Sequence, residues 1–157
     1  MKRVVVVDPL LCSGCRYCEM ACSFKHEGVF SPALSRITVV REDDIGFDYP
    51  VVCRFCESCD ALEACPTGAM RRVDGVVKVD IDKCVACGAC VTACRYGAVK
   101  ARPGGGQPIV CDLCGGDPVC VKRCPTRALA YSEGEDMSLP EAREYFIGFM
   151  RRLGANV

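Results

Sequence analysis

Sixteen cysteines constrain this chain of 157 residues more than any other feature, and they fall into four groups of four with none left over. Two groups have the spacing C-x2-C-x2-C-x3-C, and in each of the other two one gap holds five residues. Cysteines separated by only two residues are poor partners for a structural disulfide but good metal ligands. We therefore expect all sixteen to bind metal: Cys12, Cys15, Cys18, Cys22, Cys53, Cys56, Cys59, Cys65, Cys84, Cys87, Cys90, Cys94, Cys111, Cys114, Cys120 and Cys124.

The spacing predicts which metal centre these cysteines hold. Runs of this kind place thiolates around cubane [4Fe–4S] clusters. Three thiolates from one tight loop cover one face of the cubane, and the fourth must come from elsewhere in the chain. In two-cluster ferredoxins the fourth cysteine of each run binds the other cluster, which explains an even number of runs. Four groups with no spare thiol predict four [4Fe–4S] clusters.

Two other uses of cysteine are disfavoured. Zinc ribbons use two separated C-x2-C pairs and not triads with a trailing fourth cysteine. A secreted disulfide scaffold would scatter its cysteines, and the N-terminal apolar run is too short for a signal peptide. We therefore expect a reducing cytoplasm. No run of about 18 apolar residues predicts a membrane span, and no basic stripe predicts nucleic-acid binding.

The formal net charge of zero, with 20 Lys and Arg against 20 Asp and Glu, counts the cysteines as neutral. Ligating thiols are deprotonated. Sixteen thiolates and four cluster cores of about 2+ would give the loaded protein about −8. Basic side chains beside the ligands either compensate this charge locally or are ordinary solvated residues: Arg16, Arg54, Arg95, Lys122, Arg123 and Arg127.

Short strands alternate with the cysteine groups. Asp74-Gly75 between residues 70–73 and 76–79 predicts a two-residue hairpin. Further strands are expected at 2–7, 37–41, 47–52, 99–101, 108–110 and 127–132. The last cysteine of each group fits a short helical turn, as in residues 90–94. The pattern predicts an α+β fold in which bound clusters supply much of the stability.

The C-terminal segment, residues 136–157, differs from the rest. Ser138, Pro140 and Glu141 are typical of a helix start with a capping box. Apolar residues then recur at helical spacing up to Leu153. This amphipathic helix either packs on its own domain or docks a partner subunit.

Single residues between these elements are less informative. His26 is the only histidine, and a surface or hydrogen-bonding role is expected rather than iron ligation. Gly14, Gly88 and Gly115 lie inside ligand loops, where glycine either lets amides approach the sulfur atoms or eases a tight turn. No dinucleotide or phosphate-loop motif occurs.

Residues 65–70, Asp74-Gly75 and 79–90 look like the middle of a bacterial two-cluster ferredoxin. The span 4–131 resembles the four-cluster, ferredoxin-like electron-transfer subunits of molybdenum and tungsten oxidoreductases, including tungsten aldehyde oxidoreductases and dimethyl-sulfoxide-reductase-type enzymes. The resemblance implies two nested two-cluster modules within residues 1–135: an inner one at about 50–100 and an outer one from about 1–49 and 101–135. It also implies these ligand sets: Cys53, Cys56, Cys59 with Cys94; Cys84, Cys87, Cys90 with Cys65; Cys12, Cys15, Cys18 with Cys124; and Cys111, Cys114, Cys120 with Cys22.

The five-residue gaps after Cys59 and Cys114 depart from the family spacing and lengthen those loops. The resemblance implies an electron-transfer subunit with no catalytic site of its own. Single electrons would pass between a large catalytic subunit, with a tungsten or molybdenum cofactor, and another redox partner such as a ferredoxin or flavin subunit. A free-standing soluble polyferredoxin is the alternative. The sequence does not distinguish the partner's substrate, the direction of electron flow or the oligomeric state.

Overall fold

The computed structural model describes residues 3–134 and 136–157. Its strands are β1 (Arg3–Val7), β2 (Thr38–Glu42), β3 (Phe47–Val51), β4 (Met70–Val73), β5 (Val76–Val79) and β6 (Leu129–Glu133). Its α-helices are α1 (Tyr17–Glu27), α2 (Asp60–Glu63), α3 (Ala89–Ala93), α4 (Val119–Arg123) and α5 (Leu139–Arg152). Two 3-10 turns, η1 (Pro32–Leu34) and η2 (Leu113–Gly115), complete the described elements.

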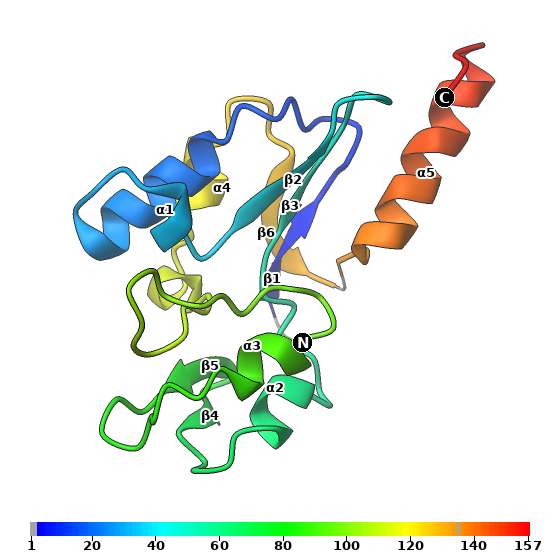
Figure 1. The fold of residues 1–157 in the computed structure, drawn as a ribbon. Coiled ribbons are helices and arrows are strands. Elements are labelled where there is room, and N and C mark those ends of the chain that lie inside the picture. The colour runs from blue at the N-terminus through cyan, green and yellow to red at the C-terminus, as the bar shows by residue number, and fades with distance from the viewer. Residues whose placement is uncertain (1–2, 135) are drawn as a thin grey trace.

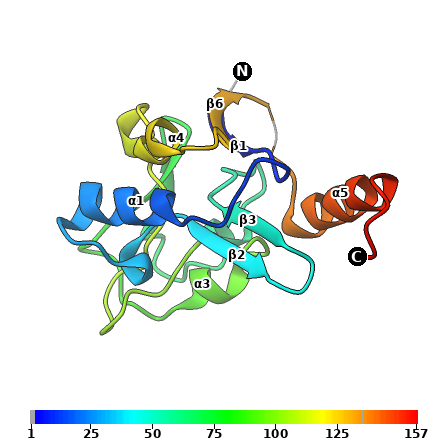
Figure 2. The same ribbon diagram turned by 90° about the horizontal axis from the view of Figure 1, so that it is seen from above.

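The first and last strands pair in space, and the middle of the chain lies beside them. Strand β1 pairs antiparallel with β6, and helix α1 packs against α4 (Figures 1 and 2). The hairpin β4–β5 and the packed helices α2 and α3 come from the middle of the sequence and lie together in Figure 1. A third antiparallel pair, β2–β3, connects the two halves along the chain. The fold is therefore the ferredoxin-like α+β class that the cysteine pattern predicts.

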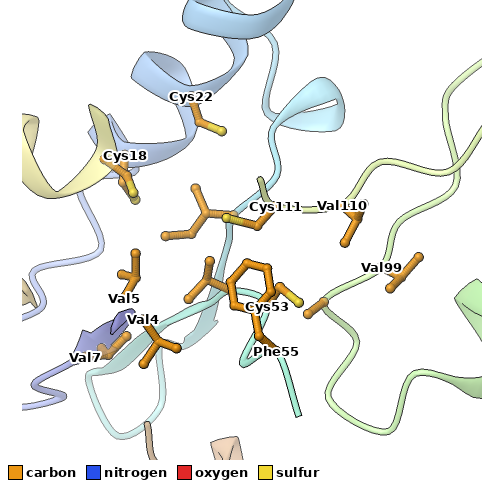
Figure 3. Packing of buried hydrophobic residues seen from close by; sticks show 14 of the residues in the cluster. Val4, Val5, Val7, Cys18, Cys22, Cys53, Phe55, Val99, Val110 and Cys111 are labelled. Carbon is orange, nitrogen blue, oxygen red and sulfur yellow. The ribbon is translucent and has the colours of Figure 1, made fainter. Parts of the chain in front are cut away.

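The buried core mixes valines with cysteine sulfur. Val4, Val5 and Val7 of β1 are buried. Neighbouring residues of a strand point to opposite faces, so the burial of both Val4 and Val5 means that both faces of β1 are covered. Figure 3 shows them in one cluster with Cys18, Cys22, Cys53 and Cys111. Cysteine behaves as a small hydrophobe when it is buried. The ligand groups are thus part of the core itself and not appendages to it.

Several elements differ in extent from the sequence expectation. The hairpin at Asp74-Gly75 forms as predicted, with Met70 paired to Val79. The strands predicted at 99–101 and 108–110 reduce to a single bridge between Lys100 and Ile109. Gly104, Gly105 and Gly106 lie in the loop between these two segments, and such a flexible loop does not fix the pairing of the residues beside it. Helix α1 is an 11-residue helix rather than a short turn. Residue 2, at the start of the first predicted strand, lies outside the described residues.

Helix α5 begins as predicted, because Ser138 and Glu141 form a reciprocal capping box. Its first half packs on its own domain: Ala142 is fully buried, and the Phe146 ring centroid lies 5.4 Å from that of Phe47. The second half extends away from the body in Figures 1 and 2. Docking of a partner on this helix stays a prediction. Within the described ranges, no helix is long and apolar enough to span a membrane.

A buried polar junction holds the start of α5. Asp136 is 5% exposed and accepts hydrogen bonds from the Val7 amide at 2.9 Å and from the Tyr49 hydroxyl at 3.1 Å. The same hydroxyl lies 2.5 Å from the Met137 carbonyl oxygen. On the surface, Arg143 forms an ion pair with Glu42, at 2.7 Å. Strands β1 and β3 are therefore tied to α5 through one carboxylate.

Candidate metal centres

The first C-x2-C step of every cysteine group has the same backbone conformation. The residue just before the second cysteine has a positive φ in all four groups: 62° at Gly14, 52° at Phe55, 53° at Ala86 and 56° at Leu113. For a residue with a side chain this left-handed conformation costs about 1–2 kcal/mol. Such strain persists where the surrounding structure imposes it, and it concentrates at functional sites. The sequence flagged only the glycine of these four residues.

The left-handed turn directs an amide toward sulfur. The Leu113 N–H donates to Cys111 Sγ at 3.4 Å. The Gly14 and Phe55 amides donate in the same way to Cys12 and Cys53, and each of these hydrogen bonds lowers the pKa of the thiol it reaches. A Cβ at Gly14 would collide with the Asp48 carboxylate, so that side chain would have to move to admit an alanine. Amides that face sulfur stabilise a thiolate and so prepare a metal ligand.

Two sets of four thiols can be traced through their mutual electrostatics. Burial raises the pKa of Cys12, and the neighbouring Cys15 and Cys124 thiolates raise it further. Burial raises the pKa of Cys18 to about 12, and the Cys120 and Cys12 thiolates add to this rise. We call four of these cysteines set A: Cys12, Cys15, Cys18 and Cys124. Burial raises the pKa of Cys53 to about 12, and three nearby thiolates contribute to the increase. With them it forms set C: Cys53, Cys56, Cys59 and Cys94.

The other two sets each line a cavity. A cavity of about 120 Å³ is bordered by set D: Cys65, Cys84, Cys87 and Cys90. A much smaller cavity, of about 10 Å³, is bordered by set B: Cys22, Cys111, Cys114 and Cys120. Burial raises the pKa of Cys120 to about 12, and thiolates of the same set increase it further. In every set, three cysteines of one group meet the last cysteine of a group distant in sequence. The resemblance implies the same four sets, and their role as ligand sets stays a prediction.

The fourth cysteines of sets A and D share a second pattern. Each begins a Cys-Pro-Thr sequence, and the threonine hydroxyl lies near the sulfur, 3.8 Å between Thr67 and Cys65 and 3.6 Å between Thr126 and Cys124. A hydrogen bond from the Met70 amide lowers the pKa of Cys65. Burial raises the pKa of Cys124, but hydrogen bonds, first the one from the Thr126 hydroxyl, outweigh burial and lower this pKa overall. Sulfur ligands with these donors suit an anionic iron–sulfur centre.

The four sets follow one another in space. Cys120 of set B raises the pKa of Cys18 in set A, and Cys53 of set C raises that of the buried Cys111 in set B. Figure 3 shows Cys111 with Cys22 on one side of it and Cys53 on the other. Helix α2, which directly follows Cys59 of set C, packs against α3, which carries Cys90 of set D. The order is therefore A, B, C, D. The two exposed cysteines, Cys15 and Cys87, belong to the two end sets.

The basic residues beside the ligands divide between the two roles left open by the sequence. Burial raises the pKa of Cys56, and the Arg54 guanidinium, which lies 4.5 Å from the Tyr96 ring centroid, opposes that increase. Arg16 and Arg95 pair with carboxylates, at 2.6 Å each. Lys122 does the same with Asp117 at 2.6 Å. Arg54 and Arg95 both interact with Cys56, whereas Arg16 and Lys122 form local ion pairs.

Two residues near sulfur were not singled out as partners by sequence reasoning. The Arg36 amide donates to Cys22 Sγ at 3.3 Å, and its guanidinium lowers the pKa of Cys114, which burial raises. His26 Nε2 lies 3.4 Å from Cys114 Sγ. Both contacts join segments far apart in sequence, so no local pattern announces them. The presence of a single histidine in a cysteine-rich chain was the one available signal.

Comparison with known proteins identifies the family. Residues 77–100 match the model of the 4Fe-4S binding domain. The polyferredoxin-like subunit of the aliphatic sulfonate oxidoreductase of Pyrococcus furiosus is 44% identical over 123 residues, which cover 76% of this chain and 70% of that one. The electron transport protein HydN of Escherichia coli is 35% identical over 154 residues, 82% of this chain and 87% of HydN. The chain belongs to the ferredoxin-like iron–sulfur electron-transport proteins.

Solved structures agree with this assignment. The ferredoxin-like protein superimposes on a chain of the active-site complex BamBC of benzoyl coenzyme A reductase with a TM-score of 0.53 and 28% identity. The match covers 98% of this chain and 92% of the other.

Formate hydrogenlyase subunit 2 of Escherichia coli is a further relative, 30% identical over 191 residues that cover 98% of this chain and 93% of that one. The ferredoxin-like protein is thus similar both to complex subunits and to electron transport proteins.

Proposed function

We propose that this ferredoxin-like protein carries four [4Fe–4S] clusters, one on each of sets A to D. The observation that supports the proposal most strongly is that every cysteine belongs to one set of four, and that two sets border cavities. Each cluster would supply reversible uptake of one electron. The chain would hold the clusters through thiolates, exclude water from set B with its apolar surroundings, and direct amides at the sulfur atoms.

The spatial order of the sets supports a relay. Sets A and D each contain an exposed cysteine, Cys15 or Cys87, whereas Cys111 of set B and Cys53 of set C are buried. Electrons would enter at one end and leave at the other. Exposed apolar side chains flank both ends, Leu11 and Tyr17 beside set A and Ile81 and Val85 beside set D. The protein would perform no bond chemistry of its own.

We propose further that one end meets a large catalytic oxidoreductase subunit with a tungsten or molybdenum cofactor, and the other a second redox protein. The names of the relatives support a complex: a subunit of an aliphatic sulfonate oxidoreductase, a formate hydrogenlyase subunit and a BamBC chain. Sixteen reduced thiols favour the cytoplasm as the compartment. In this view residues 1–135 form the cluster domain, and residues 136–157 form a possible docking element.

A free-standing polyferredoxin is the second candidate, and the similarity to HydN, which is named an electron transport protein and not a subunit, favours it. Size-exclusion chromatography of the protein purified anaerobically from its own cells distinguishes the two. Elution with a large oxidoreductase supports the subunit. Elution as a monomer supports the free carrier.

Anaerobic iron and acid-labile sulfide analysis tests the cluster content. Four clusters predict about 16 iron and about 16 sulfide per chain. A count near eight iron atoms in undamaged protein would contradict four clusters. Zinc in place of iron would contradict the electron-transfer function altogether.

Double substitutions test the ligand sets. If Cys94 and Cys53 bind the same cluster, the double change Cys94→Ala with Cys53→Ala alters the EPR signal of one cluster and leaves the other three unchanged. The matched control, Cys94→Ala with Cys84→Ala, alters the signals of two clusters, whether each loses all its iron or keeps three iron atoms. Two altered clusters in the first variant would refute the assignment of Cys94 and Cys53 to one set.

A further inference from the structure

Helix α1 presents a histidine beside one of the four sets. His26 follows Cys22 by four residues, so both side chains lie on the same face of α1. That face is turned toward the loop of set B, where the His26 Nε2 lies 3.4 Å from Cys114 Sγ and 3.5 Å from Asp112 Oδ1. The imidazole side chain is only 11% exposed. The ring is therefore held between two anionic groups with little access to water.

The chemistry of these neighbours determines where the imidazole carries its hydrogen. A ligating cysteine is a thiolate, and a carboxylate is an acceptor only. Asp112 Oδ1 already accepts the Cys114 amide at 2.9 Å, so this oxygen and Cys114 Sγ both face Nε2 as acceptors. Nε2 must accordingly be the protonated nitrogen of the ring. The contact is then an N–H···S hydrogen bond into the sulfur shell of set B.

The position of set B gives this hydrogen bond its importance. Set B lies between sets A and C, next to Cys18 on one side and Cys53 on the other. Its other donors come from the backbone, including the Arg36 and Leu113 amides. Among the described residues, His26 is the one aromatic side chain whose ring nitrogen lies within hydrogen-bond distance of a cysteine sulfur. Hydrogen bonds to sulfur and burial are the terms by which a protein sets a cluster potential.

We propose that His26 is a positioning residue that raises the reduction potential of the cluster on set B through its hydrogen bond to Cys114. Reduction adds negative charge to the cluster, and a donor aimed at its sulfur shell binds the reduced form more tightly. A tenfold preference for the reduced form corresponds to a shift of about 59 mV for one electron. The inference rests on the proposed four-cluster function.

His26 is not needed as an iron ligand in this arrangement. Cys22, Cys111, Cys114 and Cys120 already supply four thiolates around one cavity, which satisfies a cubane. Its neighbour Asp112 also caps the following 3-10 turn by accepting the Cys114 amide. The imidazole thus approaches a sulfur that is itself fixed by the backbone. His26 is therefore placed to hydrogen-bond to the ligand Cys114 and not to bind iron itself.

Isotope labelling can test the contact without any substitution. His26 is the only histidine, so growth on ¹⁵N-histidine labels a single ring in the whole chain. Pulsed EPR of the dithionite-reduced protein should detect a weak ¹⁵N coupling to one reduced cluster. Absence of ¹⁵N coupling from every reduced cluster overturns the proposal, and so does a strong coupling of the size that a direct Fe–N bond gives.

Redox titration followed by EPR tests the effect on potential. His26→Leu removes the donor, and we expect the midpoint potential of one cluster to fall while the other three keep theirs. His26→Gln retains an N–H donor and should restore part of the difference. The matched control Thr126→Val removes a donor 3.6 Å from Cys124 in set A and should act on a different cluster. Four unchanged potentials in His26→Leu refute the inference.

Iron analysis of the wild type separates the two levels of the argument. About 16 iron atoms in the wild type with unchanged potentials in His26→Leu would refute the role of His26 alone. A wild-type count near eight would refute the proposed function first. If His26→Leu loses iron, the ¹⁵N coupling in the wild type decides the question, since that measurement needs no variant.

Discussion

Tyr49→Phe tests how helix α5 is held to the domain. Tyr49 is 2% exposed, and its hydroxyl faces the Asp136 carboxylate at 3.1 Å and the Met137 carbonyl at 2.5 Å. Phenylalanine keeps the ring, which stacks against Phe47 at 6.1 Å, and removes only the donor. The change therefore leaves packing intact while a buried carboxylate loses one of its hydrogen bonds.

The size of the effect follows from the charge and the burial of the acceptor. A hydrogen bond to a charged group contributes about 1.5–3 kcal/mol. At about 1.4 kcal/mol per tenfold change, the equilibrium for local opening of α5 should rise about ten- to a hundredfold. Hydrogen–deuterium exchange of the loaded protein measures this opening amide by amide, and residues 139–147 should lose protection together.

The surface ion pair between Arg143 and Glu42 provides the control. Both side chains are about one-third exposed, 39% and 32%, and such pairs contribute about 0.2–1 kcal/mol. Arg143→Gln should then increase opening less than about sixfold. If Tyr49→Phe leaves protection of α5 within twofold of wild type, or if Arg143→Gln has the larger effect, the buried junction is not what anchors the helix.

Three further outcomes are expected. Gly14→Ala should lower the iron content of the loaded protein, because its Cβ would push against the Asp48 carboxylate. The control Gly88→Ala, at φ 78° with open space around it, should cost only about 1–2 kcal/mol of stability and keep its iron. Phe146→Ala should destabilise the attachment of α5 by about 3–5 kcal/mol, measured by exchange. Burial raises the pKa of Asp136, so the anchor should weaken as pH rises through the folded pKa, within the pH range in which the acid-labile clusters stay intact. In Asp136→Asn, exchange corrected for its intrinsic rate should lose this pH dependence.

Local chemistry made some elements predictable from sequence. Asp74-Gly75 fixed the β4–β5 register because a two-residue turn admits one pairing. Ser138 and Glu141 located the start of α5 because a capping box is complete within four residues. The long glycine run after Pro103 carried no such constraint, and the strands beside it shrank to one bridge.

Other features depend on contacts that no local pattern contains. Phe55 and Leu113 occupy left-handed backbone that their own propensities disfavour, so only the shape of the ligand loop accounts for them. His26 meets Cys114 across 88 residues of sequence. The cysteine spacing predicted the family and the kind of metal centre, whereas partners of the sulfur atoms emerged only when the chain was folded.

The pairing of β1 with β6 has a consequence for synthesis of the chain. Strand β1 is synthesised well before residues 129–133, with which it pairs. At about 5–20 residues per second, the valine-rich strand waits on the order of ten seconds for its partner. An apolar strand with free edges is prone to associate with other chains during that interval. Expression at a lower temperature or with a chaperone should therefore raise the soluble yield more for this protein than for a ferredoxin whose strands are neighbours in sequence.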